Sequence, residues 1–344
     1  MKESRLYEKL KDRAVKCATC AHGCVIQDGK RGICGVRENR GGALYSLVYG
    51  RPISQAVDPI EKKPLFHFHP GTTAFSVATV GCNFHCLFCQ NADISQMPRE
   101  SGRILGRETS PEQLVKAAQQ QRCRSIAYTY TEPTVFFDYT YDVALLARQE
   151  GIANIYVTNG YMTPEVLRAF AEAGSDHGSL LDAANVDLKA FSDEFYRHQC
   201  GARLQPVLDS LIQMKELGVW VEVTTLVIPG LNDSAGELKN IAEFILHNLG
   251  AETPWHVSAF YPTYKLLDRP RTPVETLRRA RQIGLEAGLR YVYEGNVPGS
   301  EGESTYCYNC GECLIKRFGY SIEHYGITES KCGQCGAQID GIGI

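Results

Sequence analysis

Three cysteines within eight residues form the chemically most distinctive group in the chain. Cys82, Cys86 and Cys89 follow an apolar, strand-like run at residues 73–79. A zinc site or a ferredoxin cluster would need a fourth ligand, and His85, inside the same loop, would be strained in that role. On an iron–sulfur cubane, three thiolates leave one iron without a protein ligand. Such an iron can bind and orient a substrate, so the spacing favours a reactive cluster over three buried or zinc-binding cysteines.

The other cysteines gather near the two ends of the chain. Of the 14 cysteines, Cys123 and Cys200 are the ones that lie alone. The first residues, MKESRLYEKLKDR, are charged and lack the apolar stretch of a secretory signal, and no segment is apolar for long enough to span a bilayer. We therefore expect a cytoplasmic protein that does not enter a membrane. Because thiols stay reduced in the cytoplasm, the grouping predicts metal binding rather than disulfides.

The C-terminal group has the spacing of a zinc ribbon. Two C-x2-C-G motifs supply its four thiols, which belong to Cys307, Cys310, Cys332 and Cys335. Four thiolates in this pattern bind one Zn²⁺ ion, usually in a structural role. A strand-like stretch at residues 314–320 separates the motifs. Cys313 could also pair with Cys310, but the glycine after Cys310 favours the first pairing, so we treat Cys313 as a spare thiol.

The N-terminal group is less specific. It supplies four thiols within eighteen residues, from Cys17, Cys20, Cys24 and Cys34, with His22 among them. Zn²⁺ and an auxiliary iron–sulfur cluster are both compatible with four cysteines, and the spacing does not decide between them. From the sequence alone we prefer zinc.

The charges of the chain are nearly balanced. The net charge of −3 and the isoelectric point near 6.3 provide no strong field that would attract nucleic acid or an acidic membrane. Lys316 and Arg317 give the C-terminal segment only a weakly basic surface. We therefore do not expect binding to nucleic acid.

Strand-like and helix-like segments alternate in the middle of the chain. Apolar and β-branched runs occupy residues 73–79, 125–130, 154–158, 184–189, 219–228, 255–260 and 290–294. Between these runs, Ser110, Thr163 and Thr272 each precede a proline and an acidic residue, which is typical of a helix start. Repeated strand and helix units predict an α/β protein whose parallel sheet is either closed into a barrel or doubly wound.

Polar residues at the strand ends favour the barrel. Glu132 follows the second run, Asn159 the third and Lys189 the fourth, while His256 lies within the sixth. Barrel enzymes build their sites at the carboxyl ends of successive strands. We therefore predict a full or partial (β/α) TIM-like barrel as the core.

Three parts of the chain follow from these patterns. We predict a small Cys-rich metal-binding module at residues 1–70, the core barrel at 71–300 and the zinc ribbon at 301–344.

The central loop matches a known signature. Its pattern C-x3-C-x-aromatic-C, with Phe88 in the aromatic position, resembles that of the radical S-adenosylmethionine (SAM) superfamily. The resemblance implies that Cys82, Cys86 and Cys89 bind a [4Fe–4S] cluster whose open iron takes the amino and carboxylate groups of SAM. One electron, from a reductant such as flavodoxin or ferredoxin, then splits SAM into methionine and a 5′-deoxyadenosyl radical.

The resemblance extends along the barrel and implies contacts with SAM. Thr131 and Glu132 lie where the superfamily has a Gly-Gly-Glu-type segment that receives the SAM amino group, with Tyr130 and Thr131 in place of the two glycines.

Two further motifs are similar to those of glycyl-radical-enzyme activases. Thr158-Asn159-Gly160 matches their Thr-Asn-Gly, and Asp187-Leu188-Lys189 matches their Asp-Leu-Lys, whose lysine meets the SAM carboxylate. His256 matches a histidine that borders SAM in the same proteins. The resemblance therefore implies that Asn159, Gly160, Asp187, Lys189 and His256 all surround SAM.

Each of these residues also has a simpler explanation. Glu132 and Lys189 could form a buried ion pair, Asn159 and Gly160 a tight turn, and His256 could be packed in the core. Their placement around one rim, in the expected order, favours the SAM site.

The ends of the chain resemble a narrower group of proteins. The opening Cys-x2-Cys-x-His-x-Cys, the segment Leu47–Arg51 and the stretch Asp58-Pro-Ile-Glu-Lys-Lys-Pro-Leu-Phe-His are similar to AmmeMemoRadiSam-system radical SAM proteins. Tyr128-Thr-Tyr-Thr-Glu-Pro-Thr and the terminal zinc ribbon agree with this resemblance. That family is related to pyruvate formate-lyase activating enzyme. Its name implies Memo-type and AMMECR-type proteins as partners.

Three functions are therefore considered. The leading hypothesis is an enzyme whose 5′-deoxyadenosyl radical abstracts hydrogen from an unidentified substrate, and the second is a glycyl-radical-enzyme activase. The third is a non-catalytic iron–sulfur or zinc protein for electron transfer or partner assembly, against which the three central cysteines argue. Aromatic residues near the expected site, such as Tyr128, Tyr130, Phe136 and Tyr261, suit small molecules and peptides alike, although core packing is their commoner role.

Overall fold

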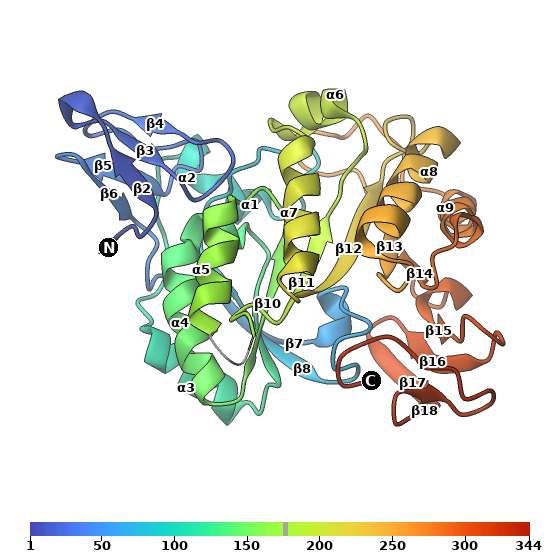
Figure 1. The fold of residues 1–344 in the computed structure, drawn as a ribbon. Coiled ribbons are helices and arrows are strands. Elements are labelled where there is room, and N and C mark those ends of the chain that lie inside the picture. The colour runs from blue at the N-terminus through green and yellow to red at the C-terminus, as the bar shows by residue number, and fades with distance from the viewer. Residues whose placement is uncertain (175–177) are drawn as a thin grey trace.

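An eight-stranded sheet forms the centre of the molecule (Figure 1). The computed structural model describes residues 1–174 and 178–344. The strands are β7 (Ser54–Pro59), β8 (Thr73–Ala78), β9 (Ser125–Tyr128), β10 (Ala153–Thr158), β11 (Ala183–Asp187), β12 (Trp220–Val227), β13 (Trp255–Ala259) and β14 (Val292–Gly295). Neighbours in the sheet follow the order of the chain, and β8 to β14 run parallel while β7 is antiparallel to β8. The seven strands expected from the sequence are thus confirmed.

The strand order decides between the two architectures that the sequence left open. A doubly wound sheet reverses its strand order at a switch point, whereas this sheet keeps sequence order throughout, as the (β/α) units of a barrel do. Within the described residues, no hydrogen-bonded ladder joins β7 to β14, so the sheet is open and a fully closed barrel is not what forms. The parallel strands are almost wholly buried, as expected when both faces are covered.

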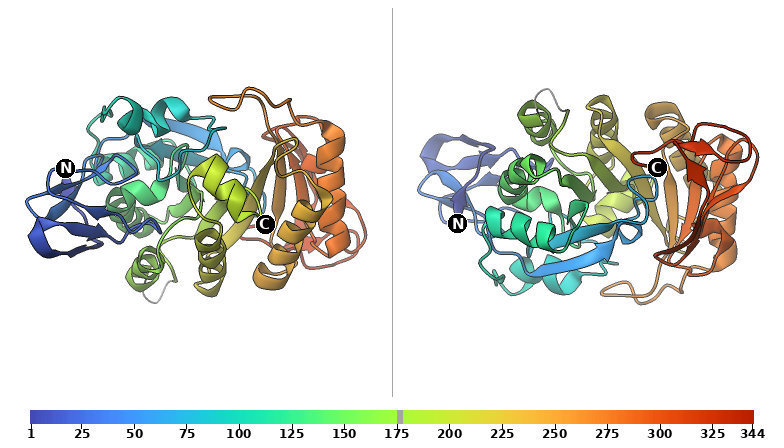
Figure 2. Two further views of the ribbon diagram at one scale, coloured as in Figure 1. Left: turned by 90° about the horizontal axis from the view of Figure 1, so that it is seen from above. Right: turned by 90° about the horizontal axis from the view of Figure 1, so that it is seen from below.

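Helices connect successive parallel strands and cover the sheet (Figures 1 and 2). The longer ones are α3 (Pro111–Gln120), α4 (Phe137–Gln149), α5 (Pro164–Gly174), α7 (Gln205–Glu216), α8 (Ala235–Phe244) and α9 (Val274–Ala287). The short ones are α1 (Ala92–Ser95), α2 (Met97–Glu100) and α6 (Asp193–Phe195), with the 3₁₀ turns η1 (Lys11–Arg13), η2 (Ile60–Lys62), η3 (Pro133–Phe136) and η7 (Glu301–Glu303). Single π turns, η5 (Tyr196–Cys200) and η6 (Ile245–Leu249), extend α6 and α8.

The helix starts show where local patterns are reliable. Ser110 forms a complete capping box with Gln113 at the start of α3. Thr272, by contrast, is not a cap: its hydroxyl donates to the Val227 carbonyl at 2.6 Å and accepts from the Phe260 amide at 2.8 Å. A helix does begin just after it, at Val274, but Thr272 does not cap this helix because long-range partners took its hydroxyl.

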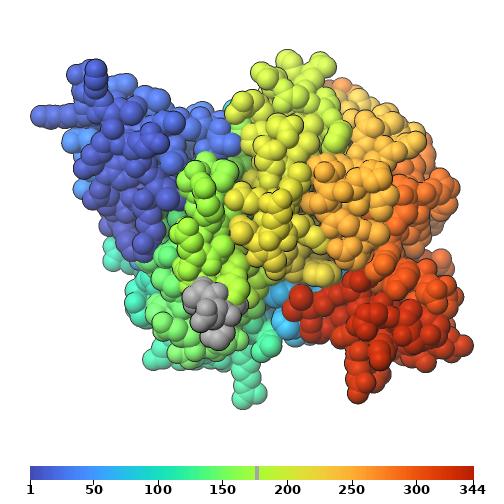
Figure 3. Space-filling view, in the orientation of Figure 1, coloured from blue at the N-terminus to red at the C-terminus, as the bar shows by residue number. Residues whose placement is uncertain are grey.

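The N-terminal segment folds into small sheets beside the central one. Strands β2 (Tyr7–Lys9), β3 (Val15–Cys17) and β4 (Val25–Ile26) form one sheet, and β1 (Lys2–Glu3), β6 (Ala43–Ser46) and β5 (Arg37–Arg40) form another. Figure 3 shows this segment as a blue lobe at one end of the molecule. β7 also comes from residues 1–70 yet belongs to the central sheet. The domain limits at residues 70 and 300 stay predictions.

The C-terminal segment lies at the other end of the molecule (Figure 2). Its strands are β15 (Thr305–Tyr306), β16 (Cys313–Phe318), β17 (Ser321–Tyr325), β18 (Ile327–Thr328) and β19 (Lys331–Cys332). The strand expected at residues 314–320 is confirmed as β16. A second apolar cluster, in which Phe66, Tyr293 and Ile315 take part, joins this segment to the central sheet.

Arg317 fixes this junction and is not a surface charge. The residue is 3% exposed, and its guanidinium donates to the Thr305 hydroxyl at 2.7 Å and the Phe66 carbonyl at 3.0 Å. It also lies 3.9 Å from the buried carboxylate of Glu61 and over the Phe66 ring. Arg317 therefore adds nothing to a basic surface, and Lys316 is the exposed member of the pair.

None of the helices in the described ranges combines the length and the apolar composition that crossing a bilayer requires.

Replacing Arg317 should loosen the C-terminal junction. Arg317→Met leaves the Glu61 carboxylate buried without its cation, so we expect a loss of about 3 kcal/mol in unfolding free energy, measured by denaturant unfolding. Lys316→Met, which removes an exposed cation paired with Glu323, is the control and should change it by less than about 0.5 kcal/mol. Equal effects of the two variants would contradict the role assigned to Arg317.

Candidate functional site

A cavity of about 690 Å³ opens at the carboxyl ends of the parallel strands. Almost all of the predicted site residues line it: Cys82, Cys86, Phe88, Cys89, Thr131, Glu132, Asn159, Asp187, Lys189 and His256. Gly160 does not. Among the aromatic residues considered from the sequence, Tyr130 lines the cavity, whereas Tyr128 and Phe136 are buried elsewhere in the core and Tyr261 is exposed.

The loop after β8 presents the three thiols to the cavity. Gly81 starts the loop with φ of +101°, and a Cβ there would meet Val36 at 2.5 Å, so only glycine fits. The loop amides of His85 and Leu87 donate to the carbonyls of Cys200 and Gln199 at 3.0 and 2.9 Å. These bonds hold the loop against η5 and leave its cysteine side chains free to face the cavity. His85 does not line it.

The spacing of the three thiols differs from that of a single-ion site. Within the described residues, the C-terminal cysteines have their ligand atoms within 4.8 Å of one another, and the central three do not. A tetrahedral Zn²⁺ ion draws its ligands close together. The wider separation suits a larger group held by all three sulfur atoms.

Burial and charge act differently on the three thiols. Burial raises the pKa of Cys82, and the nearby Glu132 carboxylate raises it further. Burial also raises the pKa of Cys89, despite the contact of its sulfur with the Ser95 hydroxyl at 3.2 Å. The pKa of Cys86 is lowered by a hydrogen bond with the Cys200 thiol and by the charge of Lys189. Sequence reasoning left Cys200 as an isolated cysteine, and only the fold brings it to the cluster loop.

Glu132 ties the ends of β9 and β10 together. Its Oε1 accepts from the Thr134 amide at 2.9 Å and the Thr158 hydroxyl at 2.8 Å, and its Oε2 accepts from the Asn159 amide at 2.8 Å. Burial raises the pKa of this carboxyl, although the hydrogen bonds oppose the shift. Glu132 does not pair with Lys189, so the ion pair considered from the sequence does not form. Oε1 also accepts from the Thr134 hydroxyl at 2.5 Å, so the lone pair that remains for a ligand in the cavity is on Oε2.

Asn159 connects the same rim to the cysteine loop. Its side-chain amide donates to Asn83 Oδ1 at 2.8 Å and lies 3.9 Å from Cys82 Sγ, while its own Oδ1 accepts from the Tyr161 amide at 3.0 Å. Gly160 follows with φ of +68°, and a Cβ there would meet Val186 at 2.8 Å. Gly160 thus makes the tight turn that aims Asn159, which agrees with the simpler explanation for the glycine.

Lys189 is a partly buried cation beside the thiols. Its Nζ donates to Asp187 Oδ2 at 2.9 Å and lies 5.8 Å from the centre of the Phe88 ring. Burial alone would lower the pKa of Lys189, but the Asp187 carboxylate outweighs burial and holds this pKa well above its usual value. The cavity wall near Cys86 therefore contains an ammonium group that is paired with the Asp187 carboxylate.

His256 is held by a residue that sequence reasoning missed. The buried Glu222 on β12 pairs with His256 Nε2 at 2.7 Å and also accepts from the amides of Phe66 and His67. His256 stacks on Tyr293 and reaches the cavity with one edge. It is thus both a packed core residue and part of the cavity wall. A glutamate within an apolar strand was the available signal for Glu222.

A second unpredicted group lies across the cavity. Lys63 is 1% exposed and donates to Asp58 Oδ2 at 2.6 Å, and Asp58 also accepts from Ser76 and from the Tyr130 hydroxyl. Tyr130 adopts φ of +64°, a left-handed conformation that glycine adopts more easily. This protein therefore keeps a glycine-like backbone at Tyr130 and uses its side chain to hold Asp58.

Comparison with known proteins identifies the family. A family model described as the radical SAM superfamily matches residues 76–245. The chain is 48% identical over 342 residues to an uncharacterized protein of Methanocaldococcus jannaschii, with 99% of each chain covered. It is 22% identical over 228 residues to the pyruvate formate-lyase-activating enzyme of Clostridium pasteurianum, covering 62% of this chain and 89% of that protein. The chain belongs to the radical SAM superfamily.

The fold agrees with this membership. A radical SAM methyltransferase from Sphaerobacter thermophilus matches with a TM-score of 0.50 at 17% identity, over 69% of this chain and 71% of that one. Membership of the radical SAM superfamily implies a [4Fe–4S] cluster and SAM as cofactors. The residues fit both groups, because three thiols line a cavity within the usual range of small-molecule sites, about 300–1,000 Å³, and Cys200, the other thiol at the loop, does not line it.

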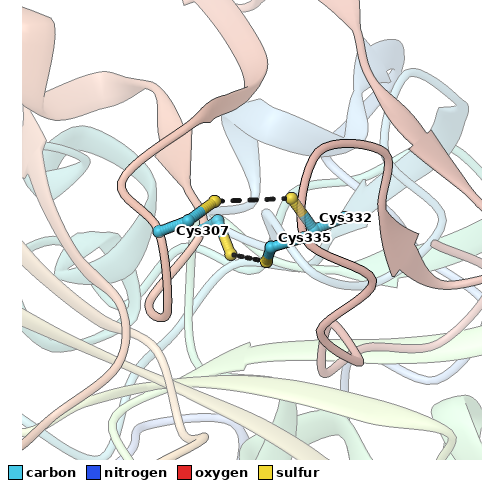
Figure 4. A group of neighbouring side chains, drawn as sticks. Cys307, Cys332 and Cys335 are labelled. Atoms are coloured by element: carbon cyan, nitrogen blue, oxygen red, sulfur yellow. Dashed lines mark hydrogen bonds between the residues drawn. The ribbon is translucent and has the colours of Figure 1, made fainter.

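The C-terminal cysteines form a compact metal-binding group. Figure 4 shows Cys307, Cys332 and Cys335 pointing toward one another. The Sγ atoms of Cys307 and Cys335 are 3.6 Å apart, and those of Cys310 and Cys332 are 3.7 Å apart. A hydrogen bond from Asn309 helps to lower the pKa of Cys335 to about 6. Cys313 lies outside the group, as expected for a spare thiol. The group could hold a metal ion, and its identity as zinc stays a prediction.

The four N-terminal cysteines also come together. Cys17, Cys20, Cys24 and Cys34 line one small cavity. His22 does not line it, and its Nε2 instead contacts the Asn83 carbonyl at 2.9 Å.

Lys63 should titrate far below an ordinary lysine. Burial lowers the pKa of Lys63 to about 8, while the neighbouring Lys62, more exposed and bound to the same Asp58, has a raised pKa. The Lys63 ammonium should therefore lose its proton as the pH rises through about 8, and that of Lys62 should not. ¹⁵N NMR of lysine-labelled protein measures both, with Lys63→Met assigning the signal. A Lys63 midpoint above that of Lys62 would contradict the arrangement.

Proposed function

We propose that this protein uses a [4Fe–4S] cluster on Cys82, Cys86 and Cys89 to cleave SAM reductively. The cluster and SAM together would supply methionine and a 5′-deoxyadenosyl radical, which abstracts hydrogen from a substrate. The observation that carries the proposal is that three cysteines line one cavity, while the neighbouring Cys200, whose thiol bonds to Cys86, does not line it. A closed electron carrier needs a fourth ligand, so the non-catalytic alternative is disfavoured.

Each polar residue of the rim has a task in this proposal. The Lys189 ammonium attracts the SAM carboxylate, since it keeps its proton and lies in the cavity wall beside the thiols. The remaining lone pair on Glu132 Oε2 suits the SAM amino group. Thr131 donates to the Thr79 carbonyl at 2.8 Å and so holds the segment before Glu132 on the end of β8. The two charged ends of SAM would thus be bound by groups of opposite charge.

The substrate would bind to cavity residues that SAM does not use. The cavity lining includes Lys63, Glu294, Glu303 and Tyr320, which come from segments outside the cysteine loop and its rim. Charged groups of both signs favour a polar substrate. Apolar side chains, including Phe66, Phe84 and Phe88, also line the cavity and would keep water from a radical.

The similarity to pyruvate formate-lyase-activating enzyme favours a glycyl-radical activase as the second candidate. Electron paramagnetic resonance (EPR) on a candidate partner distinguishes it, because an activase produces a glycine-centred signal in that partner. Within the narrower AmmeMemoRadiSam group, the proposed partners are Memo-type and AMMECR-type proteins, with a flavodoxin or ferredoxin as reductant. We further propose a partial (β/α) barrel, a C-terminal zinc ribbon and a cytoplasmic location.

SAM cleavage should depend on the cysteine loop. Anaerobically reconstituted and reduced protein mixed with SAM should release 5′-deoxyadenosine, detected by liquid chromatography and mass spectrometry. Cys82→Ala removes one of three ligands and should abolish the product. Cys313→Ala, which changes a cysteine outside all three groups, is the matched control and should keep the activity. If Cys82→Ala released as much 5′-deoxyadenosine as the unmodified protein, the result would contradict the proposal.

SAM affinity should depend on Lys189. Lys189→Met removes a charged hydrogen-bond donor from the cavity, so we expect the Kd for SAM to rise roughly ten- to a hundredfold, measured by calorimetry on reconstituted protein. Lys215→Met removes a lysine that pairs with Glu252 away from the cavity and should leave the Kd unchanged. An unchanged Kd in Lys189→Met would exclude the proposed carboxylate contact.

A further inference from the structure

The cavity around the N-terminal cysteines contains a buried arginine. Arg37 lines it together with Cys17, Cys20, Cys24 and Cys34. Arg37 is 2% exposed, on strand β5. Four thiols and one guanidinium therefore share a small space whose other lining residues are two threonines, a glycine and apolar residues.

Part of the Arg37 guanidinium lacks a hydrogen-bond partner. Its Nη1 donates to the Ser4 hydroxyl at 2.6 Å, and its Nη2 lies 2.9 Å from Asp138 Oδ2. The Nε and Nη2 atoms have no hydrogen-bond partner among the described residues, although Nη2 makes the ion-pair contact with Asp138. A buried donor without an acceptor costs about 1–3 kcal/mol, and such groups are rare in native proteins. Arg37 therefore has donors left for an acceptor, and the four cysteines line the same cavity as Arg37.

The separation of the N-terminal thiols argues against a single ion. Four thiolates on one Zn²⁺ ion, with Zn–S bonds of about 2.3 Å, must lie close together, as the C-terminal cysteines do. Within the described residues, the N-terminal cysteines do not meet the 4.8 Å separation that the C-terminal set meets. The central three cysteines do not meet it either. In the spacing of their thiols, the N-terminal cysteines therefore resemble the central cysteines and differ from the C-terminal cysteines.

We propose that Cys17, Cys20, Cys24 and Cys34 hold a second iron–sulfur cluster, and that Arg37 donates a hydrogen bond to one of its sulfur atoms. Four cysteines are the usual ligands of a closed cluster. The proposal reverses the preference for zinc drawn from the sequence. The separation of the thiols and the burial of Arg37 beside them appear only in the structure.

The second site is built directly against the central one. His22, between two of the cysteines, binds the carbonyl of Asn83, which follows Cys82. Thr134 lines the N-terminal cavity and donates to Glu132 in the central cavity wall. In addition, Cys20 forms a backbone bridge with Met162, close to the Asn159 turn. One shared wall therefore separates the two groups of thiols.

The metal content of a variant without the central ligands tests the proposal. The triple variant Cys82→Ala, Cys86→Ala, Cys89→Ala should, after anaerobic reconstitution, retain at least about two irons and as many acid-labile sulfides per chain, with about one zinc from the C-terminal group. Adding Cys34→Ser should remove that iron and sulfide, and adding Cys313→Ser should not. A triple variant that contains no iron and about two zinc ions per chain would overturn the proposal.

The same design separates this proposal from the proposed function. Iron lost between the unmodified protein and the triple variant reports on the central site, and iron retained by the triple variant reports on the N-terminal site. The proposal for each site can therefore be contradicted without affecting the proposal for the other.

The role of Arg37 has its own test in the triple variant. Arg37→Lys keeps the charge beside Asp138 but removes the Nε donor, so the EPR spectrum of the reduced cluster should change and its midpoint potential should fall. Labelling with ¹⁵N-arginine, without any change at Arg37, should give hyperfine coupling between nitrogen and the cluster spin. This second measurement holds even where Arg37→Lys folds poorly. Absence of the coupling would overturn the contact.

Discussion

The whole site depends on keeping the three thiols of the cysteine loop together in the wall of one cavity. Burial opposes the ionisation of two of them, as the raised pKa values of Cys82 and Cys89 show, whereas Cys200 and Lys189 lower the pKa of Cys86. A bound metal group would stabilise all three as thiolates. The shape of the loop comes from Gly81 and from backbone hydrogen bonds to η5. The thiol side chains are therefore available to bind the cofactor.

The parallel sheet extends this arrangement to the other strands. Because neighbouring strands follow chain order, the ends of β8, β9 and β10 lie side by side, and one hydrogen-bonded chain runs through Glu132, Asn159 and Asn83. A change in any of these side chains leaves a buried polar group without a partner. Lys189 and Asp187 continue the rim on β11 with opposite charges. The cavity is thus rigid on the cofactor side, where binding needs fixed geometry.

The sequence predicted those features whose signals are local. Seven strands, the helix start at Ser110 and the grouping of cysteines all follow from spacing and residue type, since neighbours in sequence determine them. The partners Cys200, Glu222 and Asp58 escaped prediction because each meets its site residue across the fold. Arg317 and Arg37 show the same limit: both are charged residues that the sequence alone suggests for the surface, and both are buried by long-range pairing. Gly160 was assigned to the cofactor but shapes the turn behind it.

The central claim is that the cysteine loop leaves one metal site open for SAM. The most direct measurement is electron–nuclear double resonance on the reduced protein with SAM carrying ¹⁵N in its amino group or ¹⁷O in its carboxylate. The account predicts that both labels couple to the cluster spin, and that the coupling disappears in Cys86→Ala. SAM that binds to the reduced cluster-containing protein without coupling from either label would contradict it.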